Sequence, residues 1–165
     1  MNVIPVIKIL NKLKQQHKLK DYAIFGAVAS TYYMEPVYTD DIDILVLAEL
    51  DSEYSKIWNA LKEHATKVKS FGFIISDTEV QILPTLISPL YHDAVLKAKR
   101  IKVDGTIVKV VDKEHLILLA MMANRGKDRF RASVLLQTAN IKYLNTLLKE
   151  FDKNGELKKR LSSLS

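Results

Sequence analysis

The chain has 165 residues, of which 48% are hydrophobic and 27% charged, a composition typical of one globular domain with a sizeable core. It contains no cysteine, which excludes disulfides, thiolate nucleophiles and zinc–thiolate sites and fits a reducing, cytoplasmic location. The net charge of +6 favours polyanionic partners, and no apolar run approaches the roughly 20 residues of a membrane span, so no membrane partner is expected.

The N-terminal part of the chain predicts two helices and two strands. Apolar residues recur at helical spacing from Val6 to Leu13, so we expect a helix over about 5–19 that belongs to the mature protein rather than to a signal peptide. Residues 22–25 are typical of a short buried strand, and the small residues of 27–33 predict a helix packed close to the sheet. A second buried strand is expected over 41–47.

The middle of the chain predicts one long helix followed by two strands. The helix begins at Asp51 or Ser52, which are good N-caps, and its apolar stripe continues to Val68. Strand-like stretches cover 71–75 and 79–83, and a short turn joins them.

The remaining elements are a helix, a hairpin and a helical end. Ser88 opens the helix, and Asp104-Gly105 is a strong hairpin signal. Three more helices are then expected: one capped by Asp112, one after the turn at 124–128, and one over 141–151. The tail beyond Asn154-Gly155 is weakly patterned.

This order predicts an α+β fold in which a mixed sheet carries helices and a helical part follows it. We expect a single domain over 1–165, with its core at about 20–111 and its helical C-terminal part at about 112–165.

Asp41 and Asp43 stand one residue apart at the start of the strand 41–47. Strand side chains alternate between faces, so the two carboxylates point the same way. Such a pair on a buried strand repels itself and loses water, and it persists when a cation neutralises it. Because hard cations such as Mg²⁺ prefer carboxylate oxygens, the sequence predicts a metal site here.

Gly26 lies between the strand 22–25 and the helix after it. A glycine at such a turn lets a phosphate approach the backbone, where the helix start offers free N–H groups. The turn and the acidic strand together form a plausible site for a triphosphate and the metal that bridges it.

These two elements resemble the signature of the nucleotidyltransferase superfamily of the DNA polymerase beta type. That signature is an hG-[GS] turn, a spacer and a Dx[DE] strand, and Phe25-Gly26-Ala27 and Asp41-Ile42-Asp43 stand at its two parts. The resemblance covers roughly residues 20–135 and is greatest to small prokaryotic members related to AbiEii-type toxins and minimal nucleotidyltransferases.

The resemblance implies transfer of a nucleoside monophosphate from an NTP to an acceptor hydroxyl, with Mg²⁺ or Mn²⁺ held by Asp41 and Asp43. The acceptor is left open between RNA or tRNA, a protein side chain and a small molecule such as an aminoglycoside, and an antitoxin-like partner is a further alternative. The nucleotide-binding residues expected on this basis are Gly26, Ala27, Ser30, Thr39 and Lys127, the last because Lys127-Asp128 looks like a Lys-Asp pair of the family.

Two positions depart from the family pattern. Ala27 stands where Ser or Gly is usual, and Gln81 stands where the strand 79–83 is expected to carry a third carboxylate, the base for the attacking hydroxyl. Glutamine orients a ligand but takes no proton at neutral pH. Glu79 shares the face of Gln81 and can substitute if the strand end bends inward. The sequence therefore leaves three alternatives open: a working transferase, a catalytically weak or inactive nucleotide-binding or toxin–antitoxin module, and an RNA-binding domain.

Charge is unevenly distributed along the chain. Residues 1–22 carry a net charge of +4, residues 23–92 of −6 and residues 93–165 of +8. The dense basic stretch 125–131 can bind a triphosphate or a nucleic-acid backbone, or it can be a solvated helix face with local salt bridges.

Histidines and tyrosines are two further kinds of candidate functional residue in this chain. The four histidines share no ligand spacing, so we expect each to be a surface or helix polar residue: His17, His64, His92 and His115. Three tyrosines near the acidic strand can stack on a base, although packing explains them as well: Tyr32, Tyr33 and Tyr38.

Overall fold

The computed structural model describes residues 1–164, which form a mixed α+β fold around one seven-stranded sheet with the strand order β3-β4-β5-β2-β1-β7-β6. The strands are β1 (Tyr22–Phe25), β2 (Asp41–Val46), β3 (Lys67–Lys69), β4 (Gly72–Ile75), β5 (Thr78–Pro84), β6 (Lys99–Val103) and β7 (Thr106–Val110). The helices are α1 (Ile4–Gln15), α2 (Gly26–Ser30), α3 (Asp51–Lys62), α4 (Pro89–Leu96), α5 (Lys113–Ala123), α6 (Gly126–Leu136), α7 (Ile141–Phe151) and α8 (Glu156–Ser162), with a short 3₁₀ turn, η1, at Thr85–Ile87.

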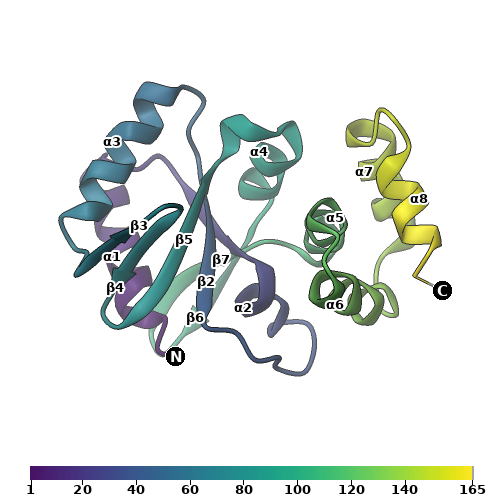
Figure 1. The fold of residues 1–165 in the computed structure, drawn as a ribbon, viewed down its shortest axis with the longest axis horizontal. Helices are drawn as coiled ribbons and strands as arrows, with labels where there is room; N and C mark the ends of the chain where they lie inside the picture. The colour runs from purple at the N-terminus through teal and green to yellow at the C-terminus, as the bar shows by residue number, and fades with distance from the viewer. Residues whose placement is uncertain (165) are drawn as a thin grey trace.

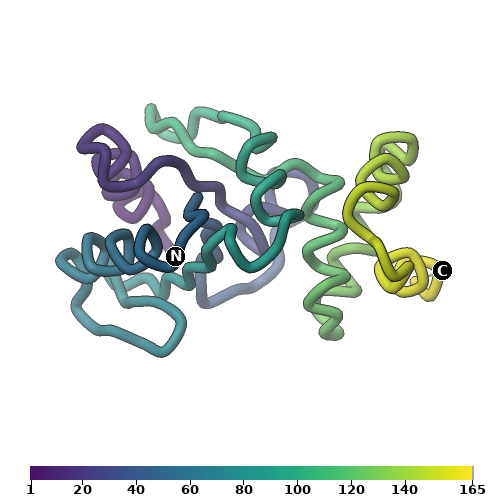
Figure 2. The backbone as a smooth tube through the Cα atoms, turned by 90° about the horizontal axis from the view of Figure 1, so that it is seen from above, coloured from purple at the N-terminus to yellow at the C-terminus, as the bar shows by residue number. Residues whose placement is uncertain are grey.

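The two faces of the sheet are covered differently. Ile42 and Ile44 point to the face that carries α1 and α3, where the rings of Trp58 and Phe73 pack with their centroids 4.5 Å apart. Alternation along β2 then sends Asp41 and Asp43 to the opposite face, on which α2, α4 and α5 lie. Both ribbon and tube views place α5–α8 beside the sheet, at the end away from α3 (Figures 1 and 2).

Strand β2 lies at the centre of the sheet and joins the segments that carry the predicted site. It pairs antiparallel with β1, which sets Phe25 opposite Asp43. It pairs parallel with β5, which sets Asp43 opposite Gln81. Residues from three separate parts of the sequence therefore meet on one face of the sheet.

Most expected elements are confirmed, with four differences in extent. Helix α1 ends at Gln15 rather than near 19, and α2 ends at Ser30 rather than 33. Helix α3 ends at Lys62, and the apolar stripe expected to reach Val68 is interrupted because 67–69 pairs with β4 as the edge strand β3. The weakly patterned tail contains α8, which buries Leu157. No helix within residues 1–164 is long and apolar enough to cross a membrane.

Candidate functional site

Gly26 gives β1 a sharp turn into α2 directly against Asp43. Its φ of +68° lies in the left-handed region that favours glycine. A Cβ atom at this position would lie 2.1 Å from Oδ2 of Asp43. The glycine therefore leaves the space in which the Asp43 carboxylate sits.

Asp41 and Asp43 point to the same face, as predicted, but they have different partners. The Thr39 hydroxyl donates to Oδ1 of Asp41 at 2.8 Å, and Nε2 of Gln81 donates to Oδ2 of Asp41 at 2.7 Å. Both oxygens of Asp41 are thus held in place, and Thr39 and Gln81 orient a carboxylate in this structure.

Asp43 is an electrostatically unfavourable carboxylate. Its pKa is raised to about 6: burial raises the pKa most, the negative charge of Asp41 adds to the rise, and the positive charges of Arg131, Arg125 and Lys127 lower it in part. No cation of residues 1–164 lies within ion-pair distance of Asp41 or Asp43. A bound cation would relieve the repulsion between the two carboxylates.

The structure places the amide side chain of Gln81 at the position where a third carboxylate was expected. Gln81 lies opposite Asp43 in the strand register, and Glu79 lies opposite Asp41. The Glu79 carboxylate is engaged by Lys69 in an ion pair on the β3 side. Gln81, which takes no proton at neutral pH, is therefore the side chain next to Asp43 on β5.

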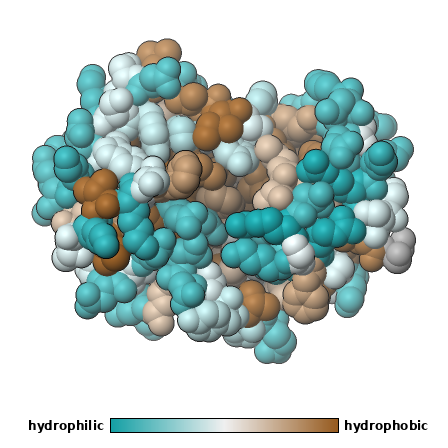
Figure 3. Space-filling view, in the orientation of Figure 1, coloured by the Kyte–Doolittle hydropathy of each residue, from teal (hydrophilic) through white to brown (hydrophobic). Residues whose placement is uncertain are grey.

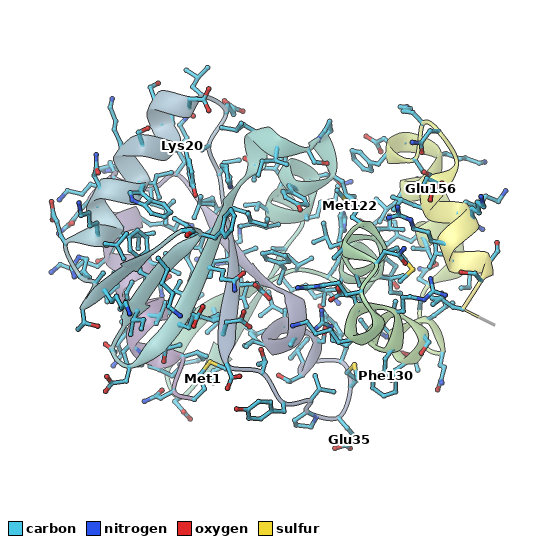
Figure 4. All side chains as sticks on the ribbon, viewed as in Figure 1. Met1, Lys20, Glu35, Met122, Phe130 and Glu156 are labelled. Carbon is cyan, nitrogen blue, oxygen red and sulfur yellow. The ribbon has the colours of Figure 1, made fainter. Side chains whose placement is uncertain are left out.

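A cavity of about 220 Å³ opens beside Asp43, between the sheet and the C-terminal helices. It brings together three residues expected from the sequence, Gly26, Ser30 and Asp43, with Gln81. The other lining residues come from β1, β5, α4, α5, α6 and the α5–α6 junction: Phe25, Leu83, Tyr91, Leu116, Leu119, Ala120, Ala123, Arg125, Asp128 and Arg131. Side chains occupy the space between the sheet and α5–α6 (Figure 4), and hydrophilic residues lie over this boundary beside a hydrophobic patch (Figure 3).

The remaining nucleotide-binding candidates lie outside the lining of this cavity. Ala27 is buried in α2, and Thr39 contacts Asp41. The Ser30 hydroxyl, which does line the cavity, donates to the Gly26 carbonyl at 2.8 Å. Lys127 is exposed at the start of α6, and its charge acts on Asp43 from a distance.

Arg125, Asp128 and Arg131 form an ion-paired cluster on the cavity wall, an arrangement that the basic stretch 125–131 did not reveal in the sequence. Asp128 is only 1% exposed, and its Oδ2 lies 2.6 Å from Nε of Arg125 while its Oδ1 pairs with Arg131. Its carboxylate also caps α6 by accepting from the Arg125 backbone N–H at 3.3 Å. The spacing of three residues between the arginines and the aspartate was the available signal, because such residues share a helix face.

His115 lies on helix α5, within the expectation of a surface or helix polar residue, but the sequence did not predict its burial or its partners. Its side chain is fully buried, and its Nδ1 and Nε2 lie 2.9 Å and 2.8 Å from carboxylate oxygens of Asp112 and Asp93. Burial lowers the pKa of His115, but the hydrogen bonds and charges of the two carboxylates outweigh it and raise the pKa. This cluster joins α4 to α5 and is separate from the cavity beside Asp43.

The metal-ligating capacity of the site rests on two side chains. Within residues 1–164, no group of three or more His, Asp or Glu side chains could hold a metal ion. Mg²⁺, however, is commonly bound through one or two carboxylates, with water and substrate phosphates completing its shell. The donor chemistry of Asp41 and Asp43 fits such an ion.

Comparisons with known proteins identify the fold. No protein-family model matches the sequence, and no curated protein matches it. Among solved structures, ANT(2″)-Ia in complex with adenylyl-2″-tobramycin matches with a TM-score of 0.57 and 13% identity over 91% of this chain and 96% of that one. An antigenic nucleotidyltransferase-like protein from Paracoccidioides brasiliensis matches with a TM-score of 0.56 and 14% identity over 96% of this chain and 85% of that one.

A solution structure of the antibiotic-resistance factor ANT(2″)-Ia also matches, with a TM-score of 0.53 and 13% identity over 96% of this chain and 94% of that one. All three matches cover at least 91% of this chain, and at this level of identity they establish the architecture alone. The chain therefore has the fold of the nucleotidyltransferase superfamily, as the Gly26 turn and the Asp41–Asp43 strand indicated.

Proposed function

We propose that this chain is a nucleotidyltransferase that moves a nucleoside monophosphate from an NTP to an acceptor hydroxyl. The observation that carries the proposal is the Asp41–Asp43 pair, which is packed against the Gly26 turn and has no ion-pair partner among residues 1–164. The cavity beside Asp43 is the place for the triphosphate, since it combines two arginines with the open backbone of Gly26.

Asp41 and Asp43 are the residues that would hold Mg²⁺ or Mn²⁺. When bound, such an ion offsets negative charge on the transferring phosphoryl group and aligns the attacking oxygen. Thr39 and Gln81 fix the orientation of Asp41 through their hydrogen bonds, so they are positioning residues in this proposal.

The cationic residues around the cavity differ in how close they lie to the proposed phosphate site. Arg125 and Arg131 line the cavity, and their shared partner Asp128 holds their guanidinium groups on its wall. Lys127, at the exposed start of α6, adds a longer-range attraction. We place the phosphates against the two arginines, with Lys127, Ser30 and the Ala27 backbone as secondary contacts.

One observation favours a second candidate, a nucleotide-binding module with weak or lost catalysis. Gln81 takes no proton, and Lys69 already engages the Glu79 carboxylate. A slow or absent transfer step would follow from the lack of a dedicated base. The relation to AbiEii-type toxins, the antitoxin-like partner and the cytoplasmic location stay predictions from the sequence.

The experiment is a transfer assay with α-labelled NTPs, Mg²⁺ or Mn²⁺, and RNA, protein and small-molecule acceptors. We expect label on one acceptor class with the native chain and none with Asp43→Asn. The matched control is Asp40→Asn, because Asp40 is exposed and bonded to the Tyr38 hydroxyl. Metal-dependent nucleotide binding without transfer would favour the second candidate, and transfer that persists in Asp43→Asn would contradict both.

A further inference from the structure

A second cavity of about 370 Å³ adjoins the proposed nucleotide site on the same face of the sheet. Its lining residues come entirely from β3, the β3–β4 turn, β4 and β5: Lys67, Lys69, Ser70, Phe71, Gly72, Glu79, Val80 and Gln81. Gln81 lines both cavities, so the two hollows meet at the side chain that contacts Asp41.

The strand register aligns this cavity with the two aspartates. One row across the sheet runs Lys67, Ile74, Glu79, Asp41, and the next runs Lys69, Gly72, Gln81, Asp43. Residues in register point to the same face, and neighbouring strands are about 4.8 Å apart, so β3 lies about 14 Å from β2. A ligand in the second cavity can therefore reach from the lysines to the carboxylates.

Gly72 explains why a hollow exists between Lys69 and Gln81. A Cβ atom at this position would lie 1.8 Å from the Val80 carbonyl oxygen, so the close approach of β4 and β5 requires glycine. Because Gly72 has no side chain, the row that leads to Asp43 is open at this point, and the sheet backbone forms the floor.

The rim of the second cavity combines positive charge with an exposed ring. Lys67 is exposed and has no carboxylate within ion-pair distance in the part of the chain that the structure describes, whereas Lys69 pairs with Glu79. Phe71 is 71% exposed in the β3–β4 turn. Proteins bind single-stranded nucleic acid with cations that contact its phosphates and aromatic rings that stack on its bases. The rim of the second cavity carries both kinds of group.

The same charges argue against a polycationic acceptor such as an aminoglycoside. The second cavity has one carboxylate, Glu79, and Lys69 already neutralises it. A ligand with several ammonium groups would meet Lys67 and Lys69 without a free carboxylate to bind. An anionic acceptor, in contrast, would be attracted by the positive charge of Lys67.

We propose that the second cavity binds the end of a single-stranded nucleic acid and presents its terminal sugar hydroxyl to the NTP beside Asp43. This inference rests on the proposed function for the reaction, although the binding surface stands on its own geometry. The hydroxyl oxygen forms a bond to the α-phosphorus while the bond from that phosphorus to the bridging oxygen breaks. Pyrophosphate leaves with the bonding electron pair, and the hydroxyl proton passes to solvent water.

The direct test is fluorescence anisotropy with short labelled single-stranded RNA and DNA, measured without nucleotide or metal. We expect Lys67→Glu combined with Lys69→Glu to weaken binding about tenfold or more. The matched control is Lys8→Glu combined with Lys12→Glu, the same change of charge on exposed positions of α1, across the sheet. The control pair should retain affinity to within about threefold, since it changes only the long-range field.

A second pair of variants tests the ring. Phe71→Ala should weaken binding about tenfold, the loss of one stacked base. Phe130→Ala is the control, because Phe130 is 58% exposed at the lower edge of α6 in Figure 4 and does not line the second cavity. Circular dichroism melting of each variant checks that it folds. RNA bound more tightly than DNA identifies an RNA end as the acceptor, and the reverse identifies a DNA end.

Several outcomes would overturn the inference. Equal losses in the two lysine pairs would show nonspecific attraction, and unchanged binding in Phe71→Ala would remove the stacking contact. Transfer of label to protein or tobramycin, with no oligonucleotide binding, would assign the cavity to another acceptor. Nucleotide binding measured separately distinguishes the two proposals: if it persists while oligonucleotide binding is absent, the further inference alone fails, and in the reverse case the proposed function fails.

Discussion

Two pairs of aspartates on the same side of the molecule differ in how their negative charge is balanced. Asp93 and Asp112 are bridged by the buried ring of His115, whose nitrogens lie 2.8 Å and 2.9 Å from their oxygens. The carboxylates of Asp41 and Asp43 repel each other, and neither has an ion-pair partner among the described residues. Burial raises the pKa of Asp112, but the hydrogen bonds and charge of His115 lower it more, whereas the pKa of Asp43 rises to about 6.

The difference between the pairs distinguishes a structural cluster from the binding site that we propose. A pair that contains its own cation stabilises the junction of α4 and α5, and a further ligand adds nothing to it. A pair without one destabilises the folded state, and a bound cation would relieve the repulsion, as we propose for Asp41 and Asp43. The contrast predicts that substitutions at the His115 cluster change stability and that substitutions at Asp41 and Asp43 change ligand binding.

The largest effect is expected from His115→Ala. Removing the histidine leaves the buried Asp112 carboxylate without an ion-pair partner among the described residues and leaves Asp93 with Lys97 alone, at 3.4 Å, which should cost about 3–5 kcal/mol of unfolding free energy. Urea denaturation measures it, and His92→Ala, which removes an exposed histidine 3.3 Å from Glu49, should cost less than about 1 kcal/mol. A loss below about 1 kcal/mol in His115→Ala would mean that the cluster is not stabilising.

The pH dependence of stability should separate the two pairs in metal-free protein. Asp43 binds its proton more tightly in the folded state, with a pKa of about 6 against 3.8, so the free energy of unfolding falls as pH rises between these values. The decrease is at most about 3 kcal/mol, because one pKa unit corresponds to 1.36 kcal/mol. Asp43→Asn should abolish this decrease.

His115 should produce a second decrease at higher pH. Its pKa is raised in the folded state, so its contribution is complete below its unfolded value of 6.5 and is lost as pH rises through the folded value. His115→Ala should remove this second decrease and leave the one due to Asp43. Urea denaturation at a series of pH values measures both, and a single decrease shared by both variants would contradict the separation.

Gly26→Ala should damage both stability and the site, whereas Gly155→Ala should affect stability alone. Both glycines have positive φ, +68° and +74°, which costs a substituted residue about 1–2 kcal/mol. Only at Gly26 does the added Cβ atom meet a side chain, the Asp43 carboxylate. Calorimetric titration with Mn²⁺ and ATP should show weaker binding in Gly26→Ala, and equal binding in the two variants would argue against this geometry.

The smallest contrast concerns the basic stretch at the start of α6. Arg125→Ala removes a guanidinium from the cavity wall and should weaken NTP binding about tenfold, the loss of a charged hydrogen bond. Lys127→Ala removes an exposed charge and should weaken it about twofold. A larger effect of Lys127→Ala would support the contact expected from the Lys127-Asp128 pair.

The part of the site that depends on local sequence patterns could be predicted from the sequence. The period of two along β2 placed Asp41 and Asp43 on one face, and the Gly26 turn marked the end of β1. The position of Gln81 beside them followed instead from the resemblance to the nucleotidyltransferase superfamily, whose third carboxylate lies on the strand that matches 79–83. The first two predictions depend on neighbours in sequence and on the rules of strand alternation.

The features that the sequence did not show arise from contacts between distant segments. His115 meets Asp93 only when α5 packs on α4, and Arg131 reaches the cavity only because α6 lies beside the sheet. Strand β3 was missed because its three residues are stabilised by pairing with β4 rather than by their own pattern. Local periodicity contains no information on such packing.

The most direct test of the cation-free aspartate pair is a melting experiment with Mn²⁺ and ATP at about one hundred times their dissociation constants. The native chain and Asp40→Ala should gain about 5–10 °C, the shift expected for a ligand that binds only the folded state. The double variant Asp41→Ala, Asp43→Ala should gain nothing. An unchanged shift in the double variant would contradict metal–nucleotide binding at these two aspartates.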